Sequence, residues 1–319
     1  MSNNTQCLQH FPVSLFASVM GTTGLSIAYQ RYSHISEIPA WIGLGLLALA
    51  SILFISISLI YIMKFFQHQG EVIAEFHHPI RANFFPAISI SLLLLSIGFL
   101  EIQVRLSFWL WVSGSLLHLL FTLLIISRWI TDNYEITTSN PAWFIPVVGN
   151  ILVPIVGVEF ANREISWFFF SIGLFFWLAL FTIVFYRIIF HHQLAQKFIP
   201  TLFILIAPPA IGFISYTKLV GTIDGFARFL LYIALFFTLL LITMLPYFWR
   251  LHFFVSWWAY TFPLCAVTIA SIFAFKLLAL PLFAYLSTVL LGCSSVIVAF
   301  VFYKTIRALQ LKTLCKPEE

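Results

Sequence analysis

The amino-acid sequence predicts an all-α polytopic membrane protein with ten transmembrane helices, paired as five helical hairpins around a central pore. Three observations lead to this prediction. Hydrophobic residues make up 61% of the 319 residues and charged residues only 8%, whereas soluble domains carry about 25% charged residues. Apolar segments long enough to cross a bilayer recur along the chain. Alternate segments differ in their content of proline and small residues.

Breaks at charged and turn residues divide residues 1–319 into ten apolar segments within a single transmembrane channel domain. A span needs roughly 20 mostly apolar residues. The expected limits are 12–29, 38–66, 83–100, 106–128, 142–160, 165–190, 198–217, 226–249, 253–275 and 280–303. Because no Lys or Arg precedes the first segment, it lacks the positive region of a secretory signal, and we expect a retained span.

The distribution of Lys and Arg predicts the orientation. With ten spans, both termini lie on one side, and the basic residues of that side are Lys64, Arg81, Arg128, Arg187, Lys197, Arg250, Lys304, Arg307, Lys312 and Lys316. The other side carries Arg31, Arg105, Arg163, Lys218, Arg228 and Lys276. The positive-inside rule then predicts cytoplasmic termini. We expect a multi-pass protein of the plasma membrane, which in a bacterium is the inner membrane.

Proline separates the odd segments from the even ones. A short motif opens most odd segments: Phe11-Pro12, Phe84-Phe85-Pro86, Phe144-Ile145-Pro146 and Phe198-Ile199-Pro200, with Phe262-Pro263 lying deeper in the ninth. Proline is tolerated inside a membrane where other protein groups or water satisfy the freed backbone. The odd segments are therefore expected to be inner helices. The even ones, rich in Leu, Ile and Phe, are expected to face lipid. The recurrence predicts five hairpins of about 50–60 residues each.

Small residues recur at helical spacing along the odd segments. Such stripes let membrane helices pack closely, or they leave a lumen open. Five stripes on alternate helices favour a conduit. The candidate pore-lining residues are Gly21, Thr22, Gly24, Pro86, Ser89, Pro146, Gly149, Asn150, Pro154, Pro208, Gly212, Ser215, Ala259, Pro263, Ala266 and Ala270. Phe262 is the bulky side chain in the middle of the ninth stripe.

The middles of the segments carry no Asp, Glu, Lys or Arg. Because intramembrane charges often serve proton relay or ion coupling, this absence argues against a pump and suits a conduit with a neutral wall. The four cysteines and the histidine pairs lack the spacing of metal ligands, and no catalytic motif occurs. The basic residues are dispersed, which does not suit nucleic-acid binding. We therefore expect no enzyme activity, no metal, no cofactor and no nucleic-acid partner.

Four stretches resemble one protein family. SVMGTTGLSIAY (18–29), EFHHPIRANFFPA (75–87), NPAWFIPVVGN (140–150) and VSWWAYTFPL (255–264) are similar to the first, third, fifth and ninth helices of the tellurite-resistance/dicarboxylate transporter family. That family includes a bacterial tellurite-resistance protein and the slow anion channels of plant guard cells. The resemblance implies a quasi-fivefold arrangement of hairpins, a homotrimer with one pore in each subunit, passage of chloride and nitrate, and occlusion of the pore by Phe262.

The sequence thus favours a gated channel for small monovalent anions, lined by the odd helices and closed by Phe262. The alternative is a secondary transporter or exporter of dicarboxylates, sulfite or tellurite. A dicarboxylate carrier is expected to present a cationic group to its substrate, and the segment middles offer none. Flux measurements separate the two, because saturable, pH-coupled malate uptake without macroscopic current indicates a carrier.

Overall fold

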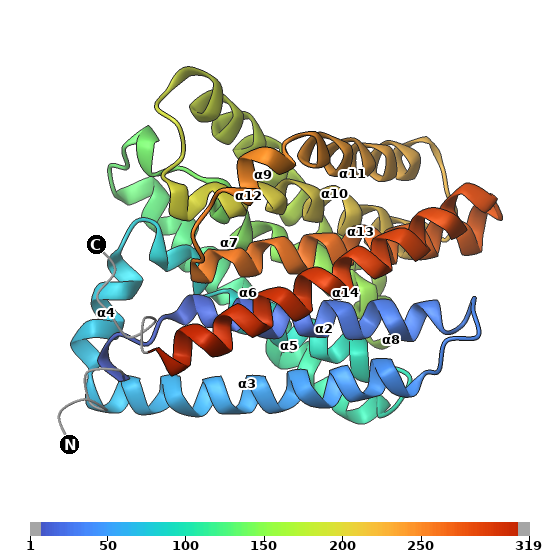
Figure 1. Ribbon diagram of the computed structural model, residues 1–319, viewed down its shortest axis with the longest axis horizontal. Coiled ribbons are helices and arrows are strands. Elements are labelled where there is room, and N and C mark those ends of the chain that lie inside the picture. Colours follow the sequence, from blue (N-terminus) through green and yellow to red (C-terminus); the bar gives the residue numbers. More distant parts are fainter. Residues whose placement is uncertain (1–7, 312–319) are drawn as a thin grey trace.

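The computed structural model of the chain describes residues 8–311, and every regular element in that range is helical (Figure 1). Cys7, Lys312, Cys315 and Lys316 lie outside it. Nine described helical segments are long and apolar enough to cross a membrane. They are Trp41–Gln67, Arg81–Phe99, Val104–Thr131, Pro141–Phe160, Arg163–Phe190, Gln196–Val220, Gly225–Thr243, Val255–Leu278 and Pro281–Gln310. Their bounds lie within a few residues of the expected ones, except at the ends of the eighth and tenth segments.

The first expected span is not among these nine. It forms a short 3₁₀ helix, η1 (Val13–Leu15), followed by α2 (Phe16–Tyr32), a 17-residue helix that contains Gly, Ser and Thr residues. Fourteen residues of α2 are buried, so its surroundings are protein and not lipid. A helix enclosed in this way needs less hydropathy than one that faces acyl chains. Length and hydropathy therefore identify nine of the ten predicted spans.

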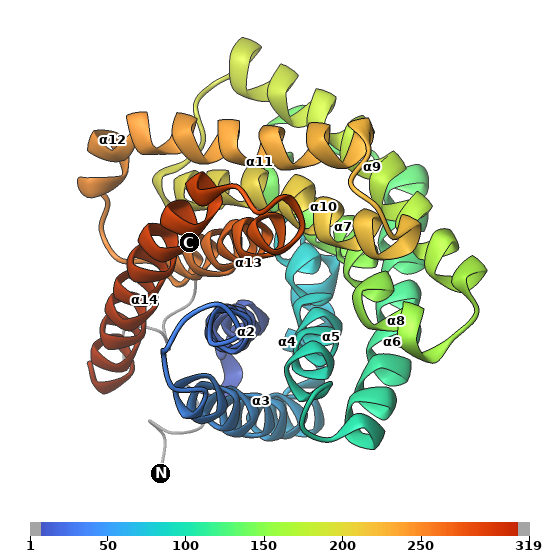
Figure 2. The same cartoon turned by 90° about the vertical axis from the view of Figure 1, so that its right-hand side faces the viewer.

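The expected alternation of buried and exposed segments is confirmed. In the most apolar stretch of each segment, between 67% and 89% of the residues are buried in the third, fifth, seventh and ninth expected spans. The corresponding share is 22–39% in the other five. These five contain α3 (Trp41–Gln67), α6 (Val104–Thr131), α9 (Arg163–Phe190), α11 (Gly225–Thr243) and α14 (Pro281–Gln310), which lie at the periphery of the bundle in Figure 2. Their many exposed Leu, Ile and Phe side chains suit a lipid environment.

The buried helices contact one another in a closed circuit. They are α2, α5 (Ala87–Phe99), α8 (Val153–Phe160), α10 (Ala207–Val220) and α13 (Thr261–Leu278). Helix α2 contacts α5 and α13, α8 contacts α5 and α10, and α10 also contacts α13. Each buried helix in addition packs against the exposed helix that follows it in sequence. Figure 2 views the bundle from one end, with α2, α5, α10 and α13 inside the peripheral helices.

Each buried helix begins with 3₁₀ turns. The 3₁₀ segments are η1, η2 (Arg81–Phe84), η4 (Pro141–Phe144), η5 (Gly149–Leu152), η6 (Gln196–Ile206) and η7 (Val255–Tyr260), with the short helix α7 (Ile145–Val148) between η4 and η5. Prolines lie in or beside these segments, where they interrupt the hydrogen bonds of a regular α-helix. Pro263 lies in the first turn of α13, where a backbone N–H has no intrahelical partner.

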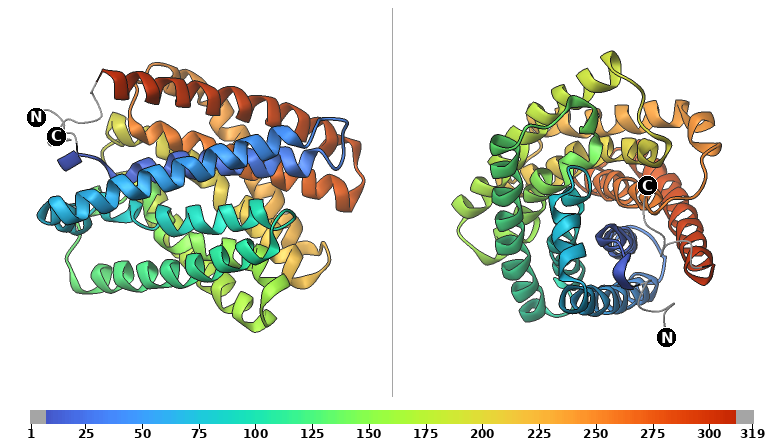
Figure 3. Two further views of the ribbon diagram at one scale, coloured as in Figure 1. Left: turned by 90° about the horizontal axis from the view of Figure 1, so that it is seen from below. Right: turned by 90° about the vertical axis from the view of Figure 1, so that its left-hand side faces the viewer.

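The remaining elements lie at the ends of the bundle. They are α4 (Gln69–His77), η3 (Ile136–Thr138) and α12 (Leu245–Trp249), which a break at Met244 separates from α11. The start of α2 and the end of α14 lie at the same end of the bundle (Figure 3). We call this end the terminal face. The opposite end, which holds the turns after α2, α5 and α10, is called the distal face.

Candidate permeation path

Three cavities follow one another through the bundle. The mouth cavity, of about 280 Å³, lies at the terminal face between Pro12, Arg81 and Lys197. The apolar cavity, of about 80 Å³, shares Ser14, Phe84, Val255 and Ser256 with the mouth cavity. The distal cavity, of about 140 Å³, is lined by the ends of the buried helices at the distal face. The shared walls make the cavities neighbours, in the order mouth, apolar and distal, from the terminal face to the distal face.

Phe262 lies between the apolar cavity and the distal cavity. Phe262, Leu152 and Ile211 line both of them, so these three side chains form the partition. Phe262 is only 9% exposed. A Cβ atom built on Gly24 would lie 3.2 Å from the Phe262 ring and 3.0 Å from the Cβ atom of Cys265. The missing side chain at Gly24 therefore leaves room for the ring beside α2.

Residues spaced three apart line the apolar cavity. They form the sets Ser14/Ala17/Met20, Phe84/Ala87/Ile90, Ile145/Val148, Gly149/Leu152, Ile204/Ala207, Pro208/Ile211 and Ser256/Ala259/Phe262. In a 3₁₀ helix, residues i and i+3 lie one above the other. The pairs Gly149/Leu152 in η5 and Ser256/Ala259 in η7 lie within 3₁₀ turns, which direct both side chains of each pair toward the cavity. Most of these side chains are apolar, and several are large.

The structure brings five of the predicted site residues to the cavity wall. Gly149, Pro208, Ala259, Phe262 and Pro263 line the apolar cavity. The others are buried but line none of the three cavities: Gly21, Thr22, Gly24, Pro86, Ser89, Pro146, Asn150, Pro154, Gly212, Ser215, Ala266 and Ala270. For all of them, contact with a permeating anion stays a prediction.

Many of these other residues face neighbouring helices. A Cβ atom on Gly21 would overlap Thr261 of α13, and one on Gly212 would touch Leu230 of α11. The hydroxyl of Ser89 lies 2.8 Å from Nδ1 of His118 on α6. The amide of Asn150 donates to Oγ1 of Thr122 on the same helix, at 3.0 Å. Small and hydroxyl side chains therefore bring the helices together or bond them.

Three of the predicted small residues lie one residue away from a lining position. Met20 lines the apolar cavity beside Gly21, Ile90 beside Ser89, and Ile211 beside Gly212. One residue corresponds to a rotation of about 100° on an α-helix. At these three positions, a larger apolar residue lines the cavity and the predicted small residue lies beside it.

Sequence reasoning missed a group of cations at the distal cavity. Arg31, Lys218 and Lys276 line it together with apolar residues. Arg31 pairs with Glu101, and Nζ of Lys218 lies 3.7 Å from Oε1 of Glu159. The signal was present in the sequence, because these cations fall at the ends of the first, seventh and ninth expected spans. The spacing of these residues along the chain indicates topology and does not show that their side chains meet.

Charged residues also line the mouth cavity at the opposite end. Arg81 and Lys197 lie there with His78 and Glu75. Burial, followed by the charges of Arg81 and Lys197, lowers the pKa of His78 below its usual value. At neutral pH His78 is therefore uncharged, and the two basic side chains provide the positive charge of this cavity.

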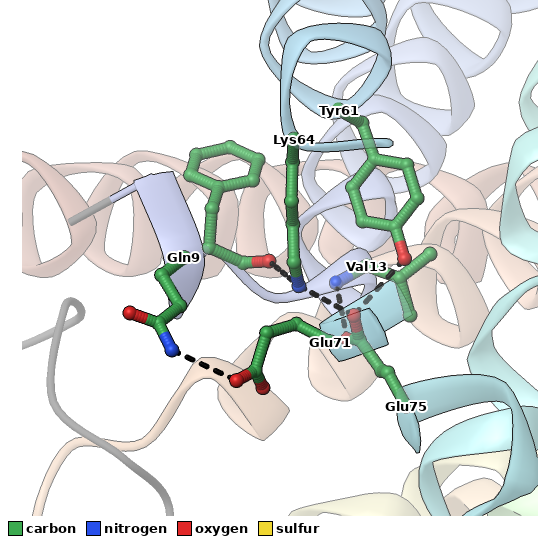
Figure 4. Close-up of polar contacts among 7 residues, drawn as sticks. Gln9, Val13, Tyr61, Lys64, Glu71 and Glu75 are labelled. Carbon is green, nitrogen blue, oxygen red and sulfur yellow. Dashed lines mark hydrogen bonds and ion pairs between the residues drawn. The ribbon is translucent and has the colours of Figure 1, made fainter. Parts of the chain in front are cut away.

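A buried ion pair fixes the start of α2 beside the mouth cavity (Figure 4). Nζ of Lys64 lies 2.7 Å from Oε2 of Glu75 and donates to the carbonyl of Phe11 at 2.8 Å. The Tyr61 hydroxyl donates to the same carboxylate oxygen at 3.0 Å, and the Val13 N–H donates to Oε1 at 2.9 Å. Glu75 thereby joins α3, α4 and the chain that enters α2.

The histidines at the terminal face have structural partners. His77 Nδ1 lies 2.8 Å from the carbonyl of Ile73, and His78 Nδ1 accepts from the N–H groups of Ile80 and Arg81. Within residues 8–311, no three His, Cys, Asp or Glu side chains are grouped as metal ligands. His77 thus bonds back to its own helix, α4, and His78 shapes the turn before η2.

The sequence is similar to known proteins along most of its length. Residues 10–306 match the family described as "SLAC1: Voltage-dependent anion channel". The chain is 29% identical over 273 residues to the S-type anion channel SLAH3 of Arabidopsis thaliana, covering 83% of this chain and 43% of that one. It is 30% identical over 289 residues to an uncharacterized transporter of Methanocaldococcus jannaschii, covering 83% and 84%.

A third relative is a tellurite resistance protein TehA homolog of Haemophilus influenzae, which is 24% identical over 274 residues and is covered for 79% of its length. The chain spans about half the length of the plant channels SLAH3 and SLAH2. The family expected from the four sequence stretches is confirmed. The chain belongs to the SLAC1 family of voltage-dependent anion channels.

Proposed function

We propose that this protein is a gated channel for small monovalent anions such as chloride and nitrate, and that Phe262 closes its path. The observation that carries the proposal is the position of Phe262, which lines the cavities on both of its sides. The apolar cavity and the distal cavity lie next to each other, and Phe262, Leu152 and Ile211 divide them. Movement of the Phe262 ring would join them. Relatives named as S-type anion channels support the same function.

The charges at the two ends favour anions over cations. Arg81 and Lys197 line the mouth cavity, and Arg31, Lys218 and Lys276 line the distal cavity. Clefts of one charge sign raise the local concentration of the opposite ion. The apolar cavity between them is lined mainly by apolar residues, so an anion would meet no tight binding site there. Weak binding permits rapid exit.

The same proposal includes the complete architecture. Helix α2 would be the first span and would bring the number of spans to ten. Five hairpins would then surround the path in quasi-fivefold order, with the buried helices inside. The closed circuit of contacts among the five buried helices supports this arrangement. Both termini would lie in the cytoplasm, and three subunits would assemble in the plasma membrane with one path each. Cysteine-accessibility labelling at each end tests the orientation, and an external C-terminus would overturn it.

Replacement of Phe262 by Ala tests the gate. The purified variant, reconstituted into planar bilayers, is expected to carry more chloride current than the parent protein because the partition loses its largest side chain. Phe275→Ala is the matched control, since Phe275 lies on the same helix but lines none of the three cavities. Equal currents for Phe262→Ala and the parent, at equal reconstitution, would contradict the gate.

A carrier is the second candidate, and the distal cavity favours it. A carrier of dicarboxylates, sulfite or tellurite needs a cationic group on its substrate path, and Arg31, Lys218 and Lys276 supply three. Proteoliposomes separate the candidates. Saturable, pH-coupled malate uptake without macroscopic current would establish a carrier, whereas chloride current that rises linearly with the driving force would establish a channel.

A further inference from the structure

The distal cavity combines a cationic rim with an apolar floor. Lys218 and Lys276 lie at the ends of α10 and α13 beside Arg31, close to the distal face. The wall below them is built from Ile and Leu side chains and ends at Phe262. A hydrated inorganic ion uses only the rim of such a cavity. A ligand that is anionic at one end and apolar at the other would use both parts.

The rim carries more positive than negative charge. Arg31 pairs with Glu101, and Lys218 lies 3.7 Å from Glu159. Lys276 forms no ion pair with any residue between 8 and 311. Arg31 and Glu101 are both near enough to interact electrostatically with the two lysines, so three cations face the carboxylates of Glu101 and Glu159. The rim therefore presents one uncompensated positive charge, which is the charge that a single carboxylate neutralises.

We propose that the distal cavity binds a short-chain aliphatic monocarboxylate. Its carboxylate lies among Lys276, Lys218 and Arg31, and its carbon chain lies on the isoleucine wall toward Phe262. The binding site itself stands on the cavity alone, while the consequence for chloride passage rests on the proposed function. A bound chain fills the space before the partition, so it obstructs the path of small anions.

The apolar floor selects against dicarboxylates. A second carboxylate on a short chain would be pressed against Ile155, Ile211 and Phe262, which offer it no hydrogen bond. Burial of an unpaired carboxylate is costly. Extra methylene groups, in contrast, gain affinity from burial against the same wall, by up to about fourfold for each group. The cavity volume of about 140 Å³ equals the liquid volume of several water molecules, so it holds only a short chain.

Saturation-transfer NMR on the full-length protein in nanodiscs measures this binding, with protein-free nanodiscs as the blank. The probes are acetate, butyrate and hexanoate, with hexanamide as the neutral isostere and succinate as the dicarboxylate. The expected order of affinity is hexanoate, butyrate, acetate, with weaker binding of hexanamide and succinate. Binding of hexanamide or succinate as tight as that of hexanoate would overturn the proposal.

Variants of the rim locate the site. Lys276→Gln and Lys218→Gln are each expected to weaken hexanoate binding about fivefold, the effect of losing one partly exposed charge pair, and Lys276→Arg is expected to retain it. Arg228→Gln is the control, because Arg228 is an exposed cation near the same face but outside the cavity. Unchanged affinity in both lysine variants would refute the site. Hexanoate binding by a protein that passes no chloride would refute the proposed function and leave this inference standing.

Discussion

The buried ion pair of Lys64 and Glu75 is expected to stabilise the packing of α3 and α4 against the start of α2, beside the mouth cavity. Only 4% of the Lys64 side chain and 5% of that of Glu75 are exposed, so neither charge has water to replace its partner. Removal of one member of a buried pair costs about 3–5 kcal/mol, because the other charge stays buried without compensation. Glu75→Met also leaves the donors of Tyr61 and Val13 unpaired, at about 1–3 kcal/mol each.

The double variant Lys64→Met/Glu75→Met carries no uncompensated charge. Its loss of unfolding free energy is therefore expected to be at least about 2 kcal/mol smaller than the summed losses of the two single variants. For independent sites, the loss in a double variant equals that sum to within about 0.5 kcal/mol. Thermal unfolding in detergent, followed by fluorescence-detected size exclusion, measures the three variants against the parent protein. Each single variant should unfold roughly 5 °C or more below the parent. Strict additivity of the three shifts would refute the assignment of a coupled buried pair.

Three further predictions concern the packing of the helices and the mouth cavity. Gly21→Ala should lower the unfolding temperature because its methyl group overlaps Thr261. A methyl group at Gly292 meets no atom within 4 Å, so Gly292→Ala should raise stability by up to about 1 kcal/mol. Equal effects of the two variants on the unfolding temperature would contradict the close contact at Gly21. Because the pKa of His78 is lowered in the folded state, the folded protein should lose stability as pH falls below about 6.5. Melting temperatures between pH 7.5 and 5 should therefore fall less in His78→Gln than in the parent, and parallel profiles would argue against the shift. The hydroxyls of Ser96 and Ser107 lie 3.1 Å apart, and their coupling energy should be about 0.6 kcal/mol, which a double-mutant cycle of Ser96→Ala and Ser107→Ala measures.

The sequence was sufficient to predict which segments are helical and which of them are enclosed. Proline and small residues mark the inner helices, and Leu, Ile and Phe mark the outer ones, because lipid selects apolar side chains while close packing selects small ones. The first span, expected at 12–29, is also helical and enclosed, as α2. Its short length and its Gly, Ser and Thr residues keep it out of the set that length and hydropathy identify.

The rotation of each helix about its own axis was not predictable in the same way. A stripe such as Gly21 and Gly24 looks the same whether it faces a lumen or a neighbouring helix. The structure turns both glycines toward α13 and turns Met20 toward the apolar cavity. Rotation depends on contacts between helices far apart in sequence, and one sequence alone does not reveal these contacts. For the same reason, Arg31, Lys218 and Lys276 were not recognised as one group.

The direction in which the Phe262 side chain points depends on the helical twist of the six residues of η7. Each residue turns the chain by about 120° in a 3₁₀ helix and by about 100° in an α-helix. Phe262 is the second residue after η7, so each residue that changes its winding rotates the ring by about 20° relative to the mouth. Val255 and Ser256, at the other end of η7, line the mouth cavity. A change from 3₁₀ to α winding in η7 would therefore turn the Phe262 ring at the partition relative to Val255 and Ser256 at the terminal face.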